Sequence, residues 1–454
     1  MTTIDNFRDT PAPDQAWTSD GKFILVPDRP SAASPHSIFA ISVESGEKRQ
    51  ITQAPAGFYS DSGIALSPDG KTLAFIRSSA VASSDIYTLP VQPLSDGVKP
   101  KKITNTHSFI GNLMWTGDGR ELLFIVERES HRMWRIPAKG GEPRMIEQLS
   151  QVWSNLTISR QGDRLAFSDF FPDLDLERLE LPAKAGDAIA PPKTIASSTR
   201  NELNARISPD GKKIAFASDR SGAYEIWTAD ADGSNPVQLT SLGAHTGTPR
   251  WSPDSQKIVF DSRVNGNADI YIVNSGGGKP RQLTVDASDD QVPNWSRDGQ
   301  SIYFVSNRGG SFQIWKMPQA GGTARQITKG GAFDAVESTD GKSLYFAREW
   351  GRTSLWQIPS EGGIETKVLD DLSFPLNFDV VSDGIYYFAA PGERNGPREL
   401  RFYSFAASRS ATVLKLPQGG AGLSLSPDRR WALIVARAPD HGDNHDGGEL
   451  PLAE

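Results

Sequence analysis

The chain has 454 residues, of which 37% are hydrophobic and 23% are charged, and it carries a net charge of −7 and no cysteine. These fractions are typical of a folded protein, and the lack of cysteine excludes disulfides, thiolate metal sites and cysteine nucleophiles. The acidic balance argues against a dedicated nucleic-acid surface, because contacts to phosphate need concentrated Lys and Arg.

Neither a secretory signal nor a membrane anchor is visible. The N-terminal residues Met1 to Arg8 contain no basic segment followed by an apolar one. No stretch approaches the roughly 18 consecutive apolar residues that a membrane-spanning helix needs. We therefore expect no membrane span, and we leave open whether Met1 is the true start.

A short turn recurs along the whole chain and reads Ser-Pro-Asp-Gly in its fullest form, at residues 208–211. Pro fixes φ, Asp bonds the local backbone and Gly closes the turn. Ten copies are spaced by 42 to 49 residues, the period of a propeller blade. They centre on Asp20, Asp69, Asp118, Gln161, Asp210, Asp254, Asp298, Asp340, Asp383 and Asp428.

Apolar strands follow each turn in register. The third strand of a repeat pairs an aliphatic with an aromatic residue, as at Ile226-Trp227, and the fourth ends in an aliphatic residue and a threonine, as at Leu239-Thr240. Helical periodicity is nearly absent. The sequence therefore predicts an all-β protein, a β-propeller built from about ten four-stranded antiparallel blades.

The number of rings is open, since ten blades exceed the usual four to eight. Repeats four and nine are the most degenerate, and residues 182–192 of the fourth are rich in Ala and Pro. We expect about four blades in residues 1–197, about six in 198–436, and a polar tail with a candidate closing strand in 437–454. Thr2 to Phe7 is a second candidate for a strand that completes a blade.

The segments 200–227, 247–254 and 306–318 resemble TolB-like propeller repeats, also called PD40 or WD40-like repeats. The chain is similar above all to the propeller region of bacterial proteins in which a winged-helix domain and a membrane span precede the propeller. The resemblance implies a non-catalytic propeller that binds a protein or ligand, often outside the cytoplasm. This sequence departs from that pattern in lacking both accessory parts, and whether they belong to the full gene product is left open. The resemblance suggests a periplasmic location, and a cytoplasmic one is the alternative because no signal peptide is visible.

The repeated Asp is best explained as a turn former, because it occupies the same place in nine of the ten repeats. No G-x-S-x-G or H-E-x-x-H motif occurs. His441 and His445 lie in a polar segment with metal-ligand residue types, but a flexible loop is the preferred interpretation. We therefore assign no catalytic, cofactor or metal residue and no cofactor.

The loops after the second strands are the most suggestive surface. They would place polar residues on consecutive blades, where a ring segment binds an anionic peptide or sugar; mutual ion pairing that ties blade to blade is the preferred alternative. His245 precedes an innermost strand and is a further candidate. The candidate surface comprises Asp219, Arg220, Arg263, Asn307, Arg308 and His245.

Two functional hypotheses follow. The first is a scaffold that binds a protein or small ligand at a propeller face, as the sensor portion of an envelope or regulatory system. The second is a propeller enzyme, a metal-dependent lactonase or lyase with its active site in the central channel, whose residues would be scattered over several blades and leave no local motif.

Overall fold

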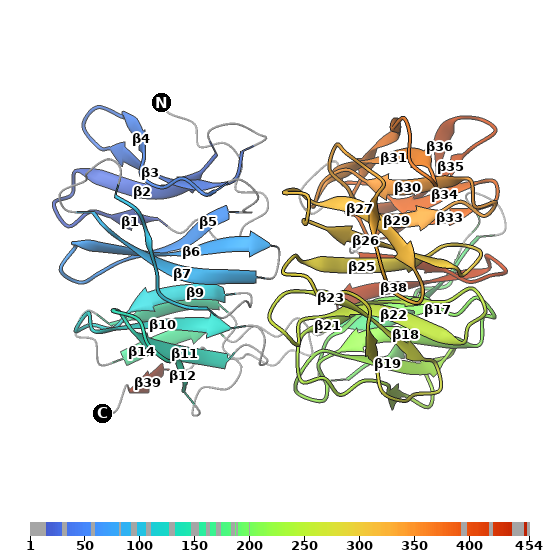
Figure 1. Ribbon diagram of the computed structural model, residues 1–454, viewed down its shortest axis with the longest axis horizontal. Helices are drawn as coiled ribbons and strands as arrows, with labels where there is room; N and C mark the ends of the chain where they lie inside the picture. Colours follow the sequence, from blue (N-terminus) through green and yellow to red (C-terminus); the bar gives the residue numbers. More distant parts are fainter. Residues whose placement is uncertain are drawn as a thin grey trace. The chain divides into compact units, whose positions relative to one another are not determined.

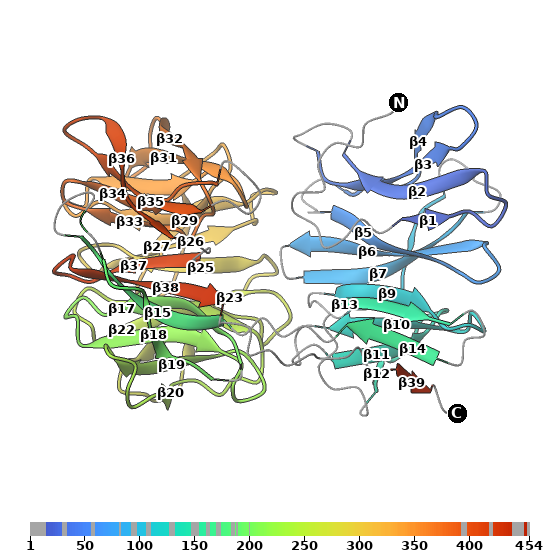
Figure 2. The same cartoon turned by 180° about the vertical axis from the view of Figure 1, so that it is seen from behind.

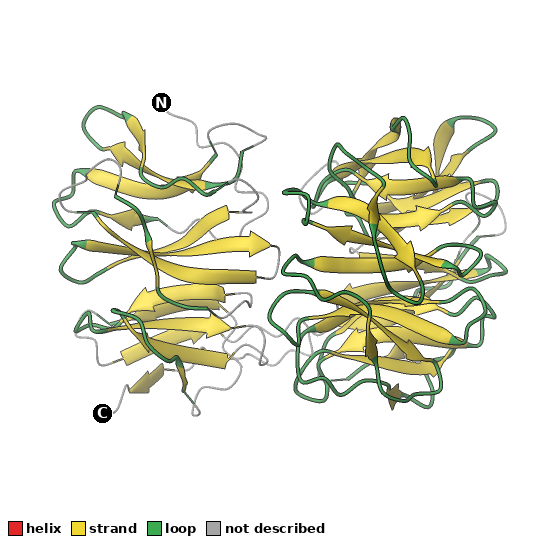
Figure 3. Ribbon diagram, viewed as in Figure 1, coloured by secondary structure: helices red, strands yellow, loops and turns green. Residues whose placement is uncertain are grey.

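The computed structural model describes residues 15–29, 34–55, 60–80, 83–91, 98–105, 110–126, 132–146, 154–159, 164–168, 174–182, 187, 189–198, 200–391, 397–416, 421–437 and 449–451. Every regular element in these ranges is a strand (Figure 3), so they contain no helix that could span a membrane. The chain forms two compact units, Met1–Phe171 with His441–Glu454, and Pro172–Asp440. The all-β prediction is confirmed, and the blades are divided between two units.

The described residues of the first unit form three antiparallel sheets of four strands and one of three strands (Figure 1). The four-stranded sheets are β1 (Ala16–Trp17), β2 (Phe23–Asp28), β3 (Ser37–Ser42) and β4 (Lys48–Gln50); β5 (Ser60–Leu66), β6 (Thr72–Ala80), β7 (Ser83–Pro90) and β8 (Lys101–Lys102); and β9 (Ile110–Trp115), β10 (Glu121–Val126), β11 (Arg132–Pro137) and β12 (Arg144–Met145). The three-stranded sheet is β13 (Ser154–Ile158), β14 (Arg164–Ser168) and β39 (Glu449–Pro451).

The part of the second unit that the structure describes forms six four-stranded antiparallel sheets. Five use consecutive strands: β17 (Glu202–Ile207), β18 (Lys213–Ser218), β19 (Glu225–Asp230) and β20 (Val237–Gln238); β21 (Thr246–Trp251), β22 (Lys257–Ser262), β23 (Asp269–Asn274) and β24 (Arg281–Gln282); β25 (Asp290–Trp295), β26 (Ser301–Ser306), β27 (Gln313–Pro318) and β28 (Arg325–Gln326); β29 (Phe333–Glu337), β30 (Ser343–Ala347), β31 (Thr353–Pro359) and β32 (Thr366–Leu372); and β33 (Phe378–Val381), β34 (Gly384–Phe388), β35 (Arg398–Ser404) and β36 (Arg409–Leu416). The sixth is β16 (Lys193–Ala196), β15 (Leu174–Glu180), β38 (Trp431–Arg437) and β37 (Ala421–Leu425), in that order.

The sheets of the second unit form a closed ring. Its innermost strands β17, β21, β25, β29, β33 and β37 contact one another in sequence, and β37 contacts β17. Apolar side chains fill the space between neighbouring sheets, as where Ile226 of β19 shares a core with Phe260 of β22. The sandwiched blades explain why strand residues on both faces are apolar.

The fourth and tenth repeats exchange their outer strands. The fourth repeat leaves β13 and β14 in the first unit, while its β15 pairs with β38 of the tenth repeat in the second (Figure 2). In return, β39 of the tenth repeat pairs with β14 (Figure 1). The structural division therefore falls at 171/172 rather than at the expected 197/198, because β15 and β16 complete the ring of the second unit. Thr2 to Phe7, the other candidate closing strand, lies outside the described residues.

The repeated turn is built as the sequence predicts. At Asp210, one carboxylate oxygen accepts hydrogen bonds from Ser208 Oγ (2.6 Å) and from the amide of Lys212 (3.1 Å), and these bonds lower the pKa of the carboxyl group. The same pair of bonds recurs at Asp20, Asp69, Asp118, Asp254, Asp298, Asp340 and Asp428. These eight copies use the Asp to hold the backbone. Asp383, which is also described, has Val381 in place of the Ser or Thr, and its carboxylate pairs with Arg429 instead.

Tryptophans at the ends of three innermost strands tie their blades to the preceding ones. The Nε1 of Trp295 donates to the carbonyl of Arg250 (3.1 Å), and that of Trp251 donates to the carbonyl of Arg206 (3.0 Å). Trp115 makes the equivalent bond to Ala65 in the first unit (3.0 Å). These bonds fix the stagger between adjacent blades.

Replacing one of these tryptophans tests the tie. Trp295→Phe should lower the free energy of unfolding of the second unit by about 1–2 kcal/mol more than Trp315→Phe does, because it leaves a buried carbonyl without its partner. The control is matched, since the Nε1 of Trp315 is buried without a hydrogen-bond partner among the described residues. Urea unfolding of both variants measures the difference, and equal losses would contradict the role of the bond.

Candidate functional site

A β-bulge with a left-handed residue interrupts the innermost strands. On β21 the register against β22 shifts between Gly247 and Arg250, and Thr248 between them has φ 47°. The equivalent positions, six residues before the turn Asp, are also left-handed at Gly63 (φ 57°), Asn204 (54°), Val292 (49°), Asp334 (40°) and Gly422 (66°). A β-branched residue such as Val292 is strained there, so the surrounding structure must hold the bulge in place.

Partners from adjacent blades hold these bulges. Asp261 of β22 accepts hydrogen bonds from Thr248 Oγ1 and, in the next blade, from the amide of Val292 (3.0 Å). Asn377 likewise accepts from the amide of Gly422 in the next blade (2.6 Å). The bulge is therefore a property of the assembled ring rather than of one strand.

Four residues before the turn Asp, the second unit presents a ring of unlike side chains, which we call the axial ring. It consists of Arg206, Arg250, Asn294, Val336, Asp379 and Ser424, one from each blade. Five of these residues come two positions after a left-handed residue, whereas β33, which carries Asp379, pairs with β34 without a register shift. In the first unit the equivalent positions are Ala16, Ala65, Met114 and Thr157, none of them charged. The charged residues of the axial ring are therefore a feature of the second unit and not of the repeat.

The axial ring lines a cavity of about 440 Å³, the axial pocket, at the end of the innermost strands where the Ser-Pro-Asp-Gly turns lie. The residue before each turn Asp surrounds the entrance. These entrance residues are Pro209, Pro253, Arg297, Thr339, Ser382 and Pro427. All six blades thus contribute both to the pocket and to its entrance.

Charged side chains meet inside the axial ring. Arg250 Nη2 lies 3.1 Å from Asp334 Oδ1, two blades further on, and both side chains are buried. Arg206 donates through Nη1 to the carbonyl of Leu423, and its buried Nε has no partner among the described residues. Burial, with the nearby charge of Arg250, lowers the pKa of Arg206 to about 10. A cation without a paired carboxylate therefore sits at the base of the pocket.

Two further arginines stand nearer the entrance, and both have partners. Arg297 donates through Nε to the carbonyl of Glu337 (3.2 Å), and its amide donates to the carboxylate of Glu337 (2.6 Å). Arg429 pairs with Asp383 (2.5 Å). The pocket lining therefore holds four guanidinium groups and the two carboxylates of Glu337 and Asp379. Asp334 and Asp383, which pair with Arg250 and Arg429, bring the carboxylates to four, so the charges at the pocket balance.

The candidate surface predicted from the sequence lies at the opposite ends of the blades from the axial pocket. Arg220 follows the end of β18 and pairs within its own sheet with Glu202 (2.7 Å). Its guanidinium stacks over Phe216 and Trp227, with centroid distances of 5.4 and 5.0 Å. The ion pairs considered from the sequence would join one blade to the next. The ion pair of Arg220 instead joins strands of a single blade.

The remaining loop residues are not all equivalent. Arg263 occupies the position of Asp219 rather than that of Arg220, because Ser218 and Ser262 align at the ends of β18 and β22. It is buried and reaches the next blade through Gln291 (3.3 Å). Asp219 accepts from the amide of Asn201 (3.0 Å).

His245 is half-buried and packs against Tyr224, with ring centroids 5.0 Å apart. Its carbonyl accepts from the amide of Arg263 (3.1 Å). His441 and His445 lie outside the described residues. Within the described ranges, no three His, Asp or Glu side chains are grouped so as to hold a metal ion.

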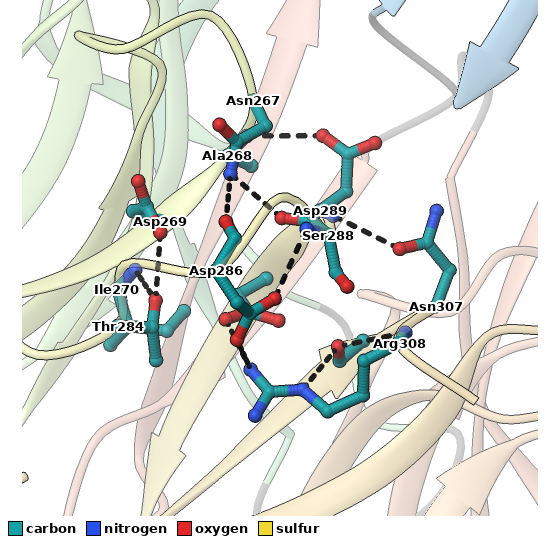
Figure 4. A network of polar contacts seen from close by, with 12 residues as sticks. Asn267, Ala268, Asp269, Ile270, Thr284, Asp286, Ser288, Asp289, Asn307 and Arg308 are labelled. Atoms are coloured by element: carbon teal, nitrogen blue, oxygen red, sulfur yellow. Dashed lines mark hydrogen bonds and ion pairs between the residues drawn. The ribbon is translucent and has the colours of Figure 1, made fainter. Parts of the chain in front are cut away.

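Arg308 stands at the centre of an acidic network (Figure 4). Its Nη2 lies 2.5 Å from Asp290 and 2.7 Å from Asp286, and its guanidinium stacks over Phe304 and Trp315, each 5.2 Å away. Its neighbour Asn307 accepts from the amide of Asp289 (3.0 Å). The candidate residues Asn307 and Arg308 therefore both anchor the loop that leads into β25.

The carboxyl groups of Asp290 and Asp269 are buried, and burial changes their pKa values. It raises the pKa of Asp290, whose residue is fully buried, and together with the charges of Asp290 and Asp286 it raises the pKa of Asp269 to about 7. Arg308 supplies the positive charge that offsets these carboxylates. Its contacts therefore give Arg308 a role in stabilising the fold, besides its place on the candidate surface.

Comparison with known proteins gives one family and a set of solved structures. Residues 190–368 match the TolB beta propeller domain. No curated protein matches the chain.

Among solved structures, a putative TolB from Agrobacterium tumefaciens is 18% identical, with 75% of this chain and 94% of that chain covered and a TM-score of 0.35. TolB from Acinetobacter baumannii is 16% identical, with 95% and 86% covered and a TM-score of 0.41. A puromycin-hydrolyzing peptidase from Mycobacterium tuberculosis is 12% identical, with 80% and 53% covered and a TM-score of 0.39.

Removing Arg308 tests whether it is needed for the fold. Arg308→Gln should lower the free energy of unfolding by about 3 kcal/mol, because it leaves the buried Asp290 without its cation. Arg325→Gln is the control: it removes an exposed pair with Glu361 and should change stability by less than about 0.5 kcal/mol. Equal stability of the two variants would show that Arg308 is free to serve a partner surface instead.

Proposed function

Since residues 190–368 form a TolB beta propeller domain, we propose that the protein is a non-catalytic scaffold whose second unit binds a protein segment or small ligand in the axial pocket. The proposal concerns the pocket at the Ser-Pro-Asp-Gly ends of the blades. The bound group enters between the turns and meets the axial ring.

The observation that carries this proposal is that the residues lining the axial pocket differ from blade to blade, although the turns and bulges around them are repeated. The turn Asp and the left-handed bulge recur from blade to blade because they build the ring. The axial ring varies instead, from Arg206 and Arg250 to Val336, although these residues occupy equivalent places. Side chains that differ around a pocket provide an asymmetric surface, which is what recognition of one particular ligand needs.

The opposite surface, with Arg220 and Arg308, stays a prediction of a second partner site. Its arginines already have carboxylate partners, so a ligand would have to compete with Glu202 and Asp290. The axial pocket needs no such competition at Arg206. For this reason we place the binding function in the pocket. A location outside the cytoplasm, and a role as a sensor, likewise stay predictions.

A photo-cross-linking residue introduced at Thr339 tests the proposal in cells that express the protein. Thr339 is exposed at the entrance of the pocket. A discrete cross-linked product, a protein or a small molecule identified by mass spectrometry, should form at this position and should be lost when the entrance residue Ser382 is replaced by Trp to block access.

Val285 provides the control position. It is 83% exposed and lies in a loop at the other ends of the blades. The same cross-linking residue there should not capture that product. Identical products from both positions, or none from Thr339, would refute a binding role for the pocket.

A further inference from the structure

We propose that the axial pocket recognises a carboxylate group of its ligand and that Arg206 is the residue that binds it. This inference rests on the proposed function, since it names the chemistry of the group that the pocket receives. It follows from the position of one guanidinium, from the partners of its neighbours and from the charge of the lining.

The guanidinium of Arg206 lies at the axis of the ring. It donates to the carbonyl of Leu423 in the neighbouring blade, and its electrostatic environment includes Arg250, Asp334 and Asp379 from three others. One side chain can be influenced by so many blades only where their innermost strands converge. Arg206 also retains partial exposure in a pocket that it lines, so an entering group can reach it.

Arg206 is the pocket arginine whose hydrogen-bonding capacity is least used by the described residues. Arg250 is paired with Asp334, Arg429 with Asp383, and Arg297 donates to two main-chain carbonyls. A guanidinium has five N–H donors in a planar fork, and the structure gives Arg206 one hydrogen bond, from Nη1. Its Nε is buried and has no partner among the described residues.

A buried donor without a partner is unfavourable, and removing part of a cation from water is also unfavourable. Here the cost appears as a pKa of Arg206 lowered to about 10, with burial as the main cause and Arg250 as the second. An anion that reaches the exposed part of the guanidinium would accept hydrogen bonds from donors that the described residues leave unused, and it would add to the negative charge that Asp334 and Asp379 supply. Ligand binding would therefore offset part of the cost of placing Arg206 here.

The lining favours a carboxylate over a more highly charged anion. The planar fork of Arg matches a carboxylate in a bidentate arrangement. A phosphate dianion would add a second negative charge close to Asp379 of the same ring and Glu337 at the entrance. The cavity of about 440 Å³ also accommodates a side chain that carries the group. The carboxylate can belong to an acidic side chain, to the C-terminus of a chain or to a small free acid.

Four probes separate these sources. The first is a five-residue peptide with blocked ends and one central glutamate, and the second is the same peptide with glutamine. The third is pentaglycine with an acetylated amino end and a free carboxyl end, and the fourth is glutarate. Isothermal titration calorimetry with the full chain measures their affinities, and the fluorescence of Trp251 and Trp295, which line the pocket, gives a second readout.

At least one carboxylate probe should bind, and the glutamine peptide should bind at least about tenfold more weakly than the glutamate peptide if the side chain is the source. Arg206→Gln should weaken the best probe by about tenfold or more, and Arg206→Lys, which keeps the charge but loses the fork, should weaken it by less. Arg325→Gln, an exposed variant outside the pocket, should leave the affinity within about twofold. Circular dichroism and thermal unfolding of each variant confirm that it is folded.

The inference is refuted if no carboxylate probe binds, or if a folded Arg206→Gln protein binds the best probe as tightly as the wild type. Cross-linking at Thr339 keeps the two levels apart. If the Thr339 cross-link still forms, and neither Arg206→Gln nor excess glutarate diminishes it, then the pocket binds a ligand but not through a carboxylate. If no cross-link forms at Thr339 in the otherwise unchanged protein, the binding function of the pocket is itself refuted.

Discussion

The bulge on the innermost strands is the constraint on which the second unit depends. A regular strand alternates its side chains between two faces, and both faces of a blade are occupied by the neighbouring blades. One left-handed residue changes the register and lets the side chain two positions later project toward the axis. The ring can therefore keep apolar cores between its blades and still line its centre with Arg206, Arg250 and Asn294. The strain at Thr248 and Val292 is tolerated because Asp261 bonds both bulges.

The exchange of strands between the fourth and tenth repeats covers strand edges in both units. Each unit needs strands from both ends of its own segment to complete a sheet, since an uncovered edge would pair with other chains. β15 and β16 complete the sheet of β37 and β38, and β39 extends the sheet of β13 and β14. The degenerate sequence of the fourth repeat, with Leu176 and Glu177 in place of the usual aliphatic and aromatic pair, reflects its division between two sheets.

The sequence was sufficient for features whose causes are local. The role of Asp210 follows from the Ser-Pro-Asp-Gly turn, and the structure builds that turn as predicted. The boundary between the units was misplaced because pairing of β15 with β38 joins residues far apart in the chain. The partners of Arg220 and Arg308 depend on strand register, which no single repeat reveals. The bulge was hidden because only Gly63 and Gly422 among its six left-handed residues are glycine. The axial ring had a signal: alignment on the turn Asp shows Arg206 and Arg250 where other blades have Val336 and Ser424.

The most direct test of this account is a double-mutant cycle between Arg250 and Asp334, two blades apart. If bulged strands bring these side chains together at the axis, Arg250→Met and Asp334→Asn should each destabilise the second unit, and the double variant should lose at least about 1.5 kcal/mol less than the sum of the two. Urea unfolding of the wild type and the three variants gives this coupling energy. Losses that add within about 0.3 kcal/mol would contradict the convergence of the blades on a shared polar centre.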